Sequence, residues 1–189
     1  MNKFDVIIVG CGPVGAIIAN LLGSNGLDVC IIEKEVSIYN KPRAIVLDWE
    51  AMRALQYCNV AHKLKSSIIP HTGTDYLGVE NELIKLFDPQ PPPYALGWPS
   101  TIMFVQPILE KLLRQSFAKK KNVKFFSGFE VVDLHEEKTG VKVEIKSVNN
   151  PKKTSLESNY LIGCDGANST VRSKINIGME SNTKEFKPA

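Results

Sequence analysis

Residues 4–33, FDVIIVGCGPVGAIIANLLGSNGLDVCIIE, carry the most distinctive pattern of this 189-residue chain. The run VIIV at 6–9 is apolar and β-branched, as in a buried strand, and the residues after the glycine turn place apolar side chains at helical spacing. A second apolar run, VCII at 29–32, ends on the acid Glu33. This order of strand, tight turn, helix, strand and acid predicts a βαβ nucleotide-binding unit.

The turn between the first strand and the helix has the spacing G-x-G-x-x-G, with its glycines at Gly10, Gly12 and Gly15. The first permits a sharp turn, the second lets backbone approach a pyrophosphate, and the third lets the helix pack against the sheet. Pro13 and Val14 open the helix, and proline suits its first position because no N–H is needed there. Free N–H groups and the helix dipole favour phosphate at this point. We therefore expect the turn to bind a pyrophosphate.

Glu33 stands at the end of the second strand, where a carboxylate can accept both hydroxyl protons of an adenosine ribose. A carboxylate there also disfavours a 2′-phosphate, so we expect FAD or NAD rather than NADP. The alternative is a glycine-rich structural turn without a ligand. The two strands and the acid in register with the turn favour nucleotide binding.

The composition is that of an ordinary soluble globular protein, with 43% hydrophobic and 23% charged residues. The net charge of +3 is too small to indicate nucleic-acid binding. The four cysteines show no metal-ligand spacing, so we expect no metal, and free cysteines are typical of a reducing cytoplasm. We find no signal peptide and no apolar run of membrane-spanning length, and expect a cytoplasmic protein without a membrane partner.

The middle of the chain predicts two short helices followed by an exposed hairpin. The five prolines within 88–100 exclude regular structure there. The expected elements are helices over 48–57, capped by Asp48, and over 60–66, and hairpin strands over 75–79 and 83–87.

The second half predicts an amphipathic helix and a return to the sheet. Three strands in this part are separated by turn residues and should form an antiparallel ribbon laid over a parallel sheet. The expected elements are a helix over 106–119, a buried sheet strand over 123–126, and ribbon strands over 129–135, 141–148 and 154–161, the last continuing into the sheet through 160–164.

A second motif, YLIGCDGANSTVR, occupies residues 160–172. The predicted strand ends at 163–166, and a helix should begin at 168–169. Asp165 would therefore lie at the carboxyl end of a strand, beside the turn that binds pyrophosphate. The alternative is an Asx turn that only caps the helix. The glycine turn on the same sheet favours the functional interpretation.

Together these motifs resemble the FAD-dependent aromatic hydroxylases, the class A flavoprotein monooxygenases of the para-hydroxybenzoate and hydroxyphenylpropionate hydroxylase type. The resemblance rests on the glycine turn with Glu33, on RAIVLD at 43–48 and on GCDGANSTVR at 163–172. It covers essentially the whole chain. It implies an α/β, Rossmann-like FAD-binding domain of the glutathione-reductase type, with a parallel sheet plus a three-stranded antiparallel ribbon, incomplete at its C-terminus.

The resemblance also implies cofactor contacts. The glycine turn would approach the FAD pyrophosphate, Glu33 would bind the adenosine ribose, and Arg43 would lie along the phosphates and ribitol. NADH or NADPH would reduce the flavin transiently, and one atom of O2 would pass to a small aromatic substrate, typically a phenol. We name no catalytic residue, because the cofactor carries this chemistry. Further implied contacts are Gln106 with the ribityl region, Val131 with adenine through its backbone, and Asp165 with Gly166 supporting the turn and the nicotinamide site.

The family has a further G-D motif and a sheet-based substrate domain, which residues 173–189 do not supply. We therefore expect one FAD-binding domain over 1–189, with 72–100 as a remnant of a substrate-lobe excursion and 173–189 as a polar tail. Alone it would not be catalytically complete, and it would need a missing C-terminal portion or a partner chain.

Other functions stay open. The chain could be a non-catalytic nucleotide-binding fragment or subunit, or a related FAD-dependent reductase. A halogenase is disfavoured because Trp49 and Trp98 do not form a W-x-W-x-I-P-like signature. A simple NAD dehydrogenase is disfavoured because a long proline-rich excursion follows the second strand.

Overall fold

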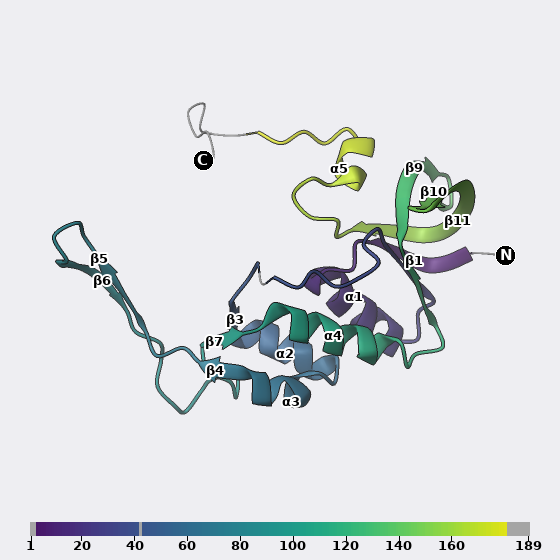
Figure 1. Cartoon of the computed structure of the whole chain (residues 1–189). Coiled ribbons are helices and arrows are strands. Elements are labelled where there is room, and N and C mark those ends of the chain that lie inside the picture. Colours follow the sequence, from purple (N-terminus) through teal and green to yellow (C-terminus); the bar gives the residue numbers. More distant parts are fainter. Residues whose placement is uncertain (1–2, 42, 181–189) are drawn as a thin grey trace.

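The core is a six-stranded sheet with helices on one face and an antiparallel ribbon folded over the other (Figure 1). The computed structural model describes residues 3–41 and 43–180. The strand order is β8-β2-β1-β11-β10-β9, and β8, β2, β1 and β11 run parallel. The strands are β1 (Lys3–Val9), β2 (Val29–Glu33), β8 (Val123–Ser127), β9 (Phe129–Glu137), β10 (Gly140–Ser147) and β11 (Asn150–Gly163).

The βαβ unit predicted from the first residues is confirmed. Strand β1 pairs in parallel with β2, from Val6 opposite Val29 to Val9 opposite Ile32, and helix α1 (Pro13–Ser24) connects them. On its other side β1 pairs in parallel with β11. The glycine turn and the second motif therefore leave neighbouring strands at the same edge of the sheet.

The antiparallel ribbon of β9, β10 and β11 continues the main sheet through β11 and folds over one face of it. Strand β11 is 14 residues long, so its first part pairs with β10 and its second part with β1. The expected strands were too short at several ends, because turn residues alone do not reveal how far pairing extends. The ribbon contributes Val131, Val143, Ile145 and Leu156 to a buried cluster with residues of β1 and β2.

The helices pack on the opposite face of the sheet (Figure 1). Asp48 caps α2 as predicted, because its side chain accepts a hydrogen bond from the Ala51 N–H at 2.7 Å. The core on this face joins apolar residues of β1 and β2 to buried side chains of the helices. The helices are α1, α2 (Trp49–Tyr57), α3 (Ala61–Leu64) with a 3₁₀ turn at Lys65–Ser67, and α4 (Gln106–Phe117).

Two expectations for the second half need correction. Strand β8 was expected to be buried, but it is one of the two edge strands of the sheet, with Lys124 exposed and Phe125 and Phe126 half-buried. An edge strand has only one neighbour, which leaves part of an apolar run open to solvent. Helix α4 ends at Phe117, before the lysine run, rather than at 119.

A small antiparallel sheet of β3 (Val46–Asp48), β7 (Thr101–Phe104) and β4 (Ile68–Pro70) was not predicted. Its strands have only three or four residues, too few to show an alternating pattern. Strand β7 lies in the centre and joins segments that are far apart in the sequence. This sheet supports the polypeptide between Arg43 and α2.

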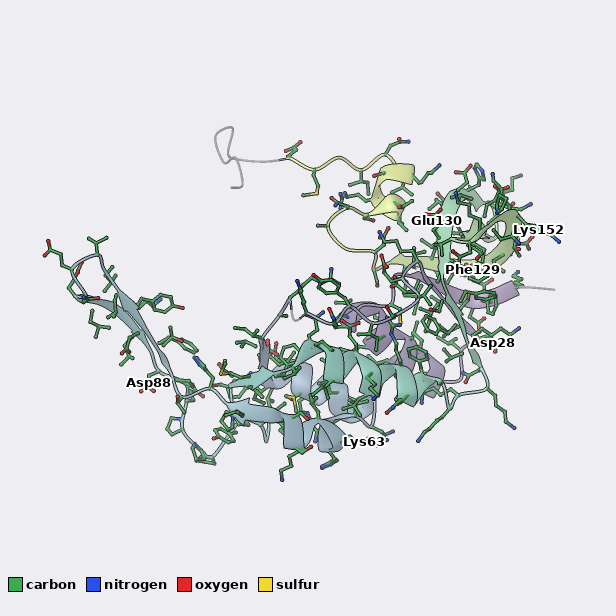
Figure 2. The ribbon with its side chains drawn as sticks, viewed as in Figure 1. Asp28, Lys63, Asp88, Phe129, Glu130 and Lys152 are labelled. Carbon is green, nitrogen blue, oxygen red and sulfur yellow. The ribbon has the colours of Figure 1, made fainter. Side chains whose placement is uncertain are left out.

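The predicted hairpin is present as β5 (Thr74–Leu77) and β6 (Leu83–Phe87), and it projects away from the core (Figure 1). Asp88 lies where its second strand returns towards the core, and the hairpin side chains stand clear of the other elements (Figure 2). No described residue of 88–100 belongs to a helix or strand, as expected. Several large apolar side chains of the hairpin are exposed: Tyr76, Leu77, Leu83, Ile84, Leu86 and Phe87.

Helix α5 (Thr170–Lys174) begins within the second motif, close to the predicted start at 168–169. Residues 175–180 beyond it are exposed. The rest of the expected polar tail, 181–189, lies outside the described residues.

Candidate cofactor-binding site

Two glycines of the turn are required by packing within the protein. Gly10 has φ +97°, and a Cβ there would overlap the backbone carbonyl of Cys164. A Cβ on Gly15 would overlap the carbonyl of Gly10 and press on the Cys164 side chain. The turn, the start of α1 and the end of β11 therefore pack together too closely for side chains at these positions.

Gly12 differs from the other two glycines because a Cβ at this position would not clash with any protein atom. Its φ of −69° suits any residue, and a Cβ there would meet no atom within 4 Å. Pro13 follows at the start of α1, Val14 is exposed, and no side chain caps the helix in the part of the chain described. The helix start therefore faces open space and fits the pyrophosphate that the G-x-G-x-x-G spacing predicts.

Glu33 lies directly beside the turn. Its Oε2 accepts a hydrogen bond from the Cys11 N–H at 2.6 Å, and its Oε1 accepts one from the Glu35 N–H at 2.9 Å. Both bonds fix the carboxylate of this half-buried side chain at the carboxyl end of β2. An acceptor carboxylate and the open N-terminal end of α1 are therefore adjacent.

The second motif meets the turn through its backbone. The Cys164 N–H donates to the Val9 carbonyl at 2.7 Å, and the Asp165 backbone nitrogen lies against Gly10. The Asp165 carboxylate points to α5, where it accepts from the Ser169 hydroxyl at 2.6 Å and from the Thr170 N–H at 2.6 Å. The side chain of Asp165 thus satisfies backbone N–H groups at the start of α5, whose N-cap residue is Ser169.

Gly166 follows with φ +81°, a conformation that favours glycine. Open space surrounds it, since a Cβ there would meet no atom within 4 Å. Gly166 therefore permits the chain to turn from the sheet towards α5. Glycine is favoured at this position by the backbone conformation and not by a close neighbour.

Arg43 and Gln106 are brought together, although 63 positions separate them in the sequence. The Gln106 Oε1 accepts from the Arg43 N–H at 3.0 Å and from the Ala44 N–H at 2.8 Å. Gln106 is buried, whereas the Arg43 side chain is exposed and its guanidinium carbon lies 5.0 Å from the centre of the Tyr39 ring. Gln106 thereby anchors the segment that carries Arg43.

Val131 lies on β9, the edge strand at the other side of the sheet from β8, opposite Ile145 of β10. Its side chain is buried in the cluster that includes Val9 and Ile32, the last residues before the turn and before Glu33. Val131 therefore packs near the carboxyl ends of β1 and β2, on the face of the sheet opposite the helices.

Two residues of the site were missed from the sequence, Glu110 and Arg114 on α4. The Arg114 Nη2 donates to the Cys11 carbonyl at 3.2 Å and lies 3.9 Å from the Glu110 Oε2. The Glu110 Oε1 accepts from the Gln106 Nε2 at 2.8 Å. A signal was available, because the three polar residues repeat every four positions along a helix and so share one face.

The cysteines near the site are neutral thiols. Burial raises the pKa of the Cys11 thiol to about 12, against the attraction of Arg114, and it raises the pKa of Cys30 to about 12 as well. Such groups carry no thiolate at neutral pH and do not act as nucleophiles. Among the residues that the structure describes, no group of three or more His, Cys, Asp or Glu is placed to hold a metal ion.

A family model described as an FAD binding domain matches residues 3–187. The match covers nearly all of the chain, so the chain belongs to this family of FAD-binding domains, and its cofactor is FAD. The open helix start, the adjacent carboxylate and the neighbouring Arg43 segment provide donors and acceptors that suit this dinucleotide.

The chain is similar to curated hydroxylases named 3-(3-hydroxy-phenyl)propionate/3-hydroxycinnamic acid hydroxylase. The protein from Comamonas testosteroni is 31% identical over 180 residues, which cover 95% of this chain and 30% of the relative. The protein from Mycolicibacterium smegmatis is 32% identical over 187 residues, covering 95% and 31%. The chain therefore spans about a third of the length of these relatives.

Solved structures of monooxygenases share the fold. The p-nitrophenol 4-monooxygenase from Pseudomonas putida superposes with a TM-score of 0.80 at 24% identity, covering 93% of this chain and 44% of that one. A flavin-dependent monooxygenase called PieE, in complex with FAD and substrate, superposes with a TM-score of 0.78 at 21% identity, covering 92% and 32%. The Rossmann-like α/β fold expected from the sequence is thus confirmed.

Proposed function

We propose that this chain is the FAD-binding portion of an NAD(P)H-dependent flavoprotein monooxygenase that hydroxylates a small phenolic substrate. One observation carries the proposal. Along 95% of its length the chain is similar to a hydroxylase of a phenolic acid, at 31% identity. The segments that this function needs, the glycine turn, Glu33 and the second motif, leave three adjacent parallel strands at one edge of the sheet.

The adenosine diphosphate half of FAD would be bound at this edge. The backbone at Gly12 and the N–H groups that begin α1 would face the pyrophosphate, with Pro13 and Val14 at the first positions of the helix. Glu33 would accept the ribose hydroxyls while its other contacts hold it beside the turn. Val131 would meet the adenine through the backbone of the edge strand.

The other half of FAD would extend along the segment anchored by Gln106. Arg43, exposed on that segment, would pair with the phosphates and ribitol, and Gln106 would approach the ribityl region. Asp165 and Gly166 would support the turn from β11 and border the place where the nicotinamide visits. When bound, the flavin supplies the redox chemistry that lets O2 transfer one atom to the substrate.

NADH or NADPH would serve as the transient reductant, and O2 as co-substrate. We take residues 1–189 as one FAD-binding domain, in which 72–100 is the excursion that would border a substrate lobe. The described helices are all too short or too polar to cross a bilayer. Four free cysteines, three of them buried, suit the reducing cytoplasm, where we place the protein.

Two cavities of the described part lie away from the glycine turn, one at the amino ends of β1 and β2 and one between the ribbon and α5. The exposed apolar residues of the hairpin favour a second candidate function, a cofactor-binding subunit that a further polypeptide must cover. In both cases the chain binds FAD without completing the reaction.

The experiment reconstitutes the purified chain with FAD and follows NADH or NADPH oxidation with a panel of phenols, including 3-(3-hydroxyphenyl)propionate. We expect bound FAD, at most slow nucleotide oxidation with release of hydrogen peroxide, and no hydroxylated product by mass spectrometry. Water must be excluded for productive oxygen transfer, and an exposed ring does not provide this. Stoichiometric hydroxylation would contradict the proposal of an incomplete enzyme, and failure to bind FAD would contradict the cofactor role.

A further inference from the structure

A row of buried polar side chains runs along α4. Gln106, Glu110 and Arg114 occupy every fourth position, so they follow one another on a single face of the helix. The side chain of Glu110 is 5% exposed and that of Arg114 is 15% exposed. Buried charges are costly unless they are paired and hydrogen-bonded, so this row must be held by specific partners.

The N-terminal end of the row holds the Arg43 segment. The Gln106 side chain accepts from two consecutive backbone N–H groups and donates its own N–H to Glu110. Its orientation is therefore fixed from both sides. A shift of Glu110 would be transmitted through Gln106 to the backbone at Arg43.

The C-terminal end of the row holds the glycine turn. Arg114 donates a hydrogen bond to the carbonyl of Cys11. The backbone N–H of Cys11 donates one to the Glu33 carboxylate. Cys11 is therefore held on its carbonyl side by a cation and on its amide side by an anion. Because Cys11 precedes Gly12, its carbonyl belongs to the peptide group that carries the Gly12 N–H. The orientation of that N–H thus depends on Arg114.

Arg114 also places a positive charge close to the turn. In the described part of the chain it is the cationic side chain that hydrogen-bonds the turn, and its guanidinium carbon lies 5.4 Å from the centre of the Phe125 ring. The Arg114 side chain is only 15% exposed, so its charge is screened less than that of an exposed side chain, and it is shared with the Glu110 carboxylate 3.9 Å away. Arg43, in contrast, is exposed to solvent.

We propose that Arg114 is a positioning residue of the pyrophosphate site, which holds the Cys11–Gly12 peptide through the Cys11 carbonyl while Glu110 links it to the Gln106 anchor. The inference rests on the proposed FAD site. Arg114 acts on the pyrophosphate through the turn and through its buried charge. Adenosine, which lacks phosphate, is insensitive to it.

The test measures the affinities of ADP, adenosine and FAD for the full chain. Arg114→Met keeps an unbranched apolar stem against Phe125 but removes the charge and the donor. We expect ADP and FAD each to bind at least about tenfold more weakly, the scale of a lost hydrogen bond to a charged group. Adenosine affinity should stay unchanged. Amide shifts of the ¹⁵N-labelled chain report ADP and adenosine binding, and flavin fluorescence reports FAD binding.

Lys111→Met is the matched control, because it removes one positive charge from an exposed position of the same helix. We expect it to leave all three affinities unchanged. Arg114→Lys keeps the charge but lacks the planar fork of donors. Arg114→Lys should weaken ADP binding detectably, but less than Arg114→Met does. If the methionine variant does not fold, the lysine variant tests the role of the guanidinium.

Three results would overturn the inference. Unchanged ADP affinity in Arg114→Met or Arg114→Lys would show that the guanidinium does not position the turn. Equal loss of adenosine and ADP affinity would show a general structural role instead. A wild-type chain that binds neither ADP nor FAD would contradict the FAD site itself. This outcome differs from one in which the wild type binds both ligands and the Arg114 variant binds them equally well, which contradicts only the role of Arg114.

Discussion

The Glu33 carboxylate accepts a hydrogen bond from the backbone N–H of Cys11 at 2.6 Å, which joins the acid at the end of β2 to the turn that follows β1. The two residues are 22 positions apart in the chain. Parallel pairing of β1 with β2 brings them together at one edge of the sheet. The carboxylate that we propose to bind the ribose and the turn that we propose to bind the phosphates are thereby held side by side by the protein itself.

Replacement of Glu33 by alanine should weaken FAD binding by about 1–3 kcal/mol, the scale for losing hydrogen bonds to a charged group. The ribose loses its acceptor, and the Cys11 N–H loses its partner at the turn. Titration of the chain into FAD, followed by flavin fluorescence, gives the affinity. Glu35→Ala removes an exposed carboxylate two residues away and should change nothing. Equal affinity of Glu33→Ala and wild type would remove Glu33 from the site.

Gly12→Val should fold but bind no FAD. The backbone at Gly12 suits valine, and no protein atom lies within 4 Å of the added Cβ, so the branched side chain should be accommodated by the protein and occupy the place proposed for the pyrophosphate. Gly178→Val, also in open space, is the control and should bind normally. Circular dichroism reports folding, and flavin absorbance after reconstitution reports binding. A yellow Gly12→Val protein would show that the turn does not hold the phosphates.

Asp165→Ala should lower the free energy of unfolding by about 1–3 kcal/mol, as expected for loss of a cap and its charged hydrogen bonds. Its carboxylate accepts from Ser169, Thr170 and Val171 at the start of α5. Urea denaturation measures the change. Asp88→Ala, at an exposed position near the hairpin, is the control. A variant as stable as wild type would show that the cap does not contribute to stability.

The chain should lose stability as the pH rises above about 9, partly through Cys30. Burial raises the pKa of this thiol from 9.0 to about 12, so the unfolded chain releases the proton first. The stability from burying the neutral thiol is fully present below pH 9 and is lost as the pH rises towards 12, by at most about 1.4 kcal/mol per pH unit.

Cys30→Ala removes this titration, so its unfolding free energy should fall less steeply between pH 9 and pH 11 than that of wild type. Urea denaturation at several pH values compares the slopes. Cys164→Ala, at a half-buried thiol, should change the slope less. Parallel curves for wild type and Cys30→Ala would contradict the assignment.

The sequence revealed those parts of the fold that depend on local pattern. The βαβ unit follows from apolar runs on both sides of a glycine turn, and the cap at Asp48 follows from its place before a helix. The exposed hairpin follows from two short strands around a polar turn. In each case the residues that determine the structure are close together in the chain.

The remaining features depend on pairing between distant segments. Strand β7 pairs with β3 and β4, which no pattern within three or four residues could indicate. Glu110 and Arg114 were not singled out from the sequence, because the spacing of polar residues along a helix does not show which distant segment covers that face. The resemblance implied a hydrogen bond from Gln106 to the ribityl region of the flavin, whereas its anchoring of the Arg43 backbone emerged only from the tertiary structure.

We propose that the chain binds FAD through its adenosine diphosphate half, at the turn between β1 and α1. The most direct measurement is FAD titration of the wild-type chain in the presence of ADP or riboflavin as competitor. The account predicts binding at one FAD per chain, displaced by ADP and unaffected by riboflavin at the same concentration. Displacement by riboflavin but not by ADP, or no FAD binding at all, would contradict it.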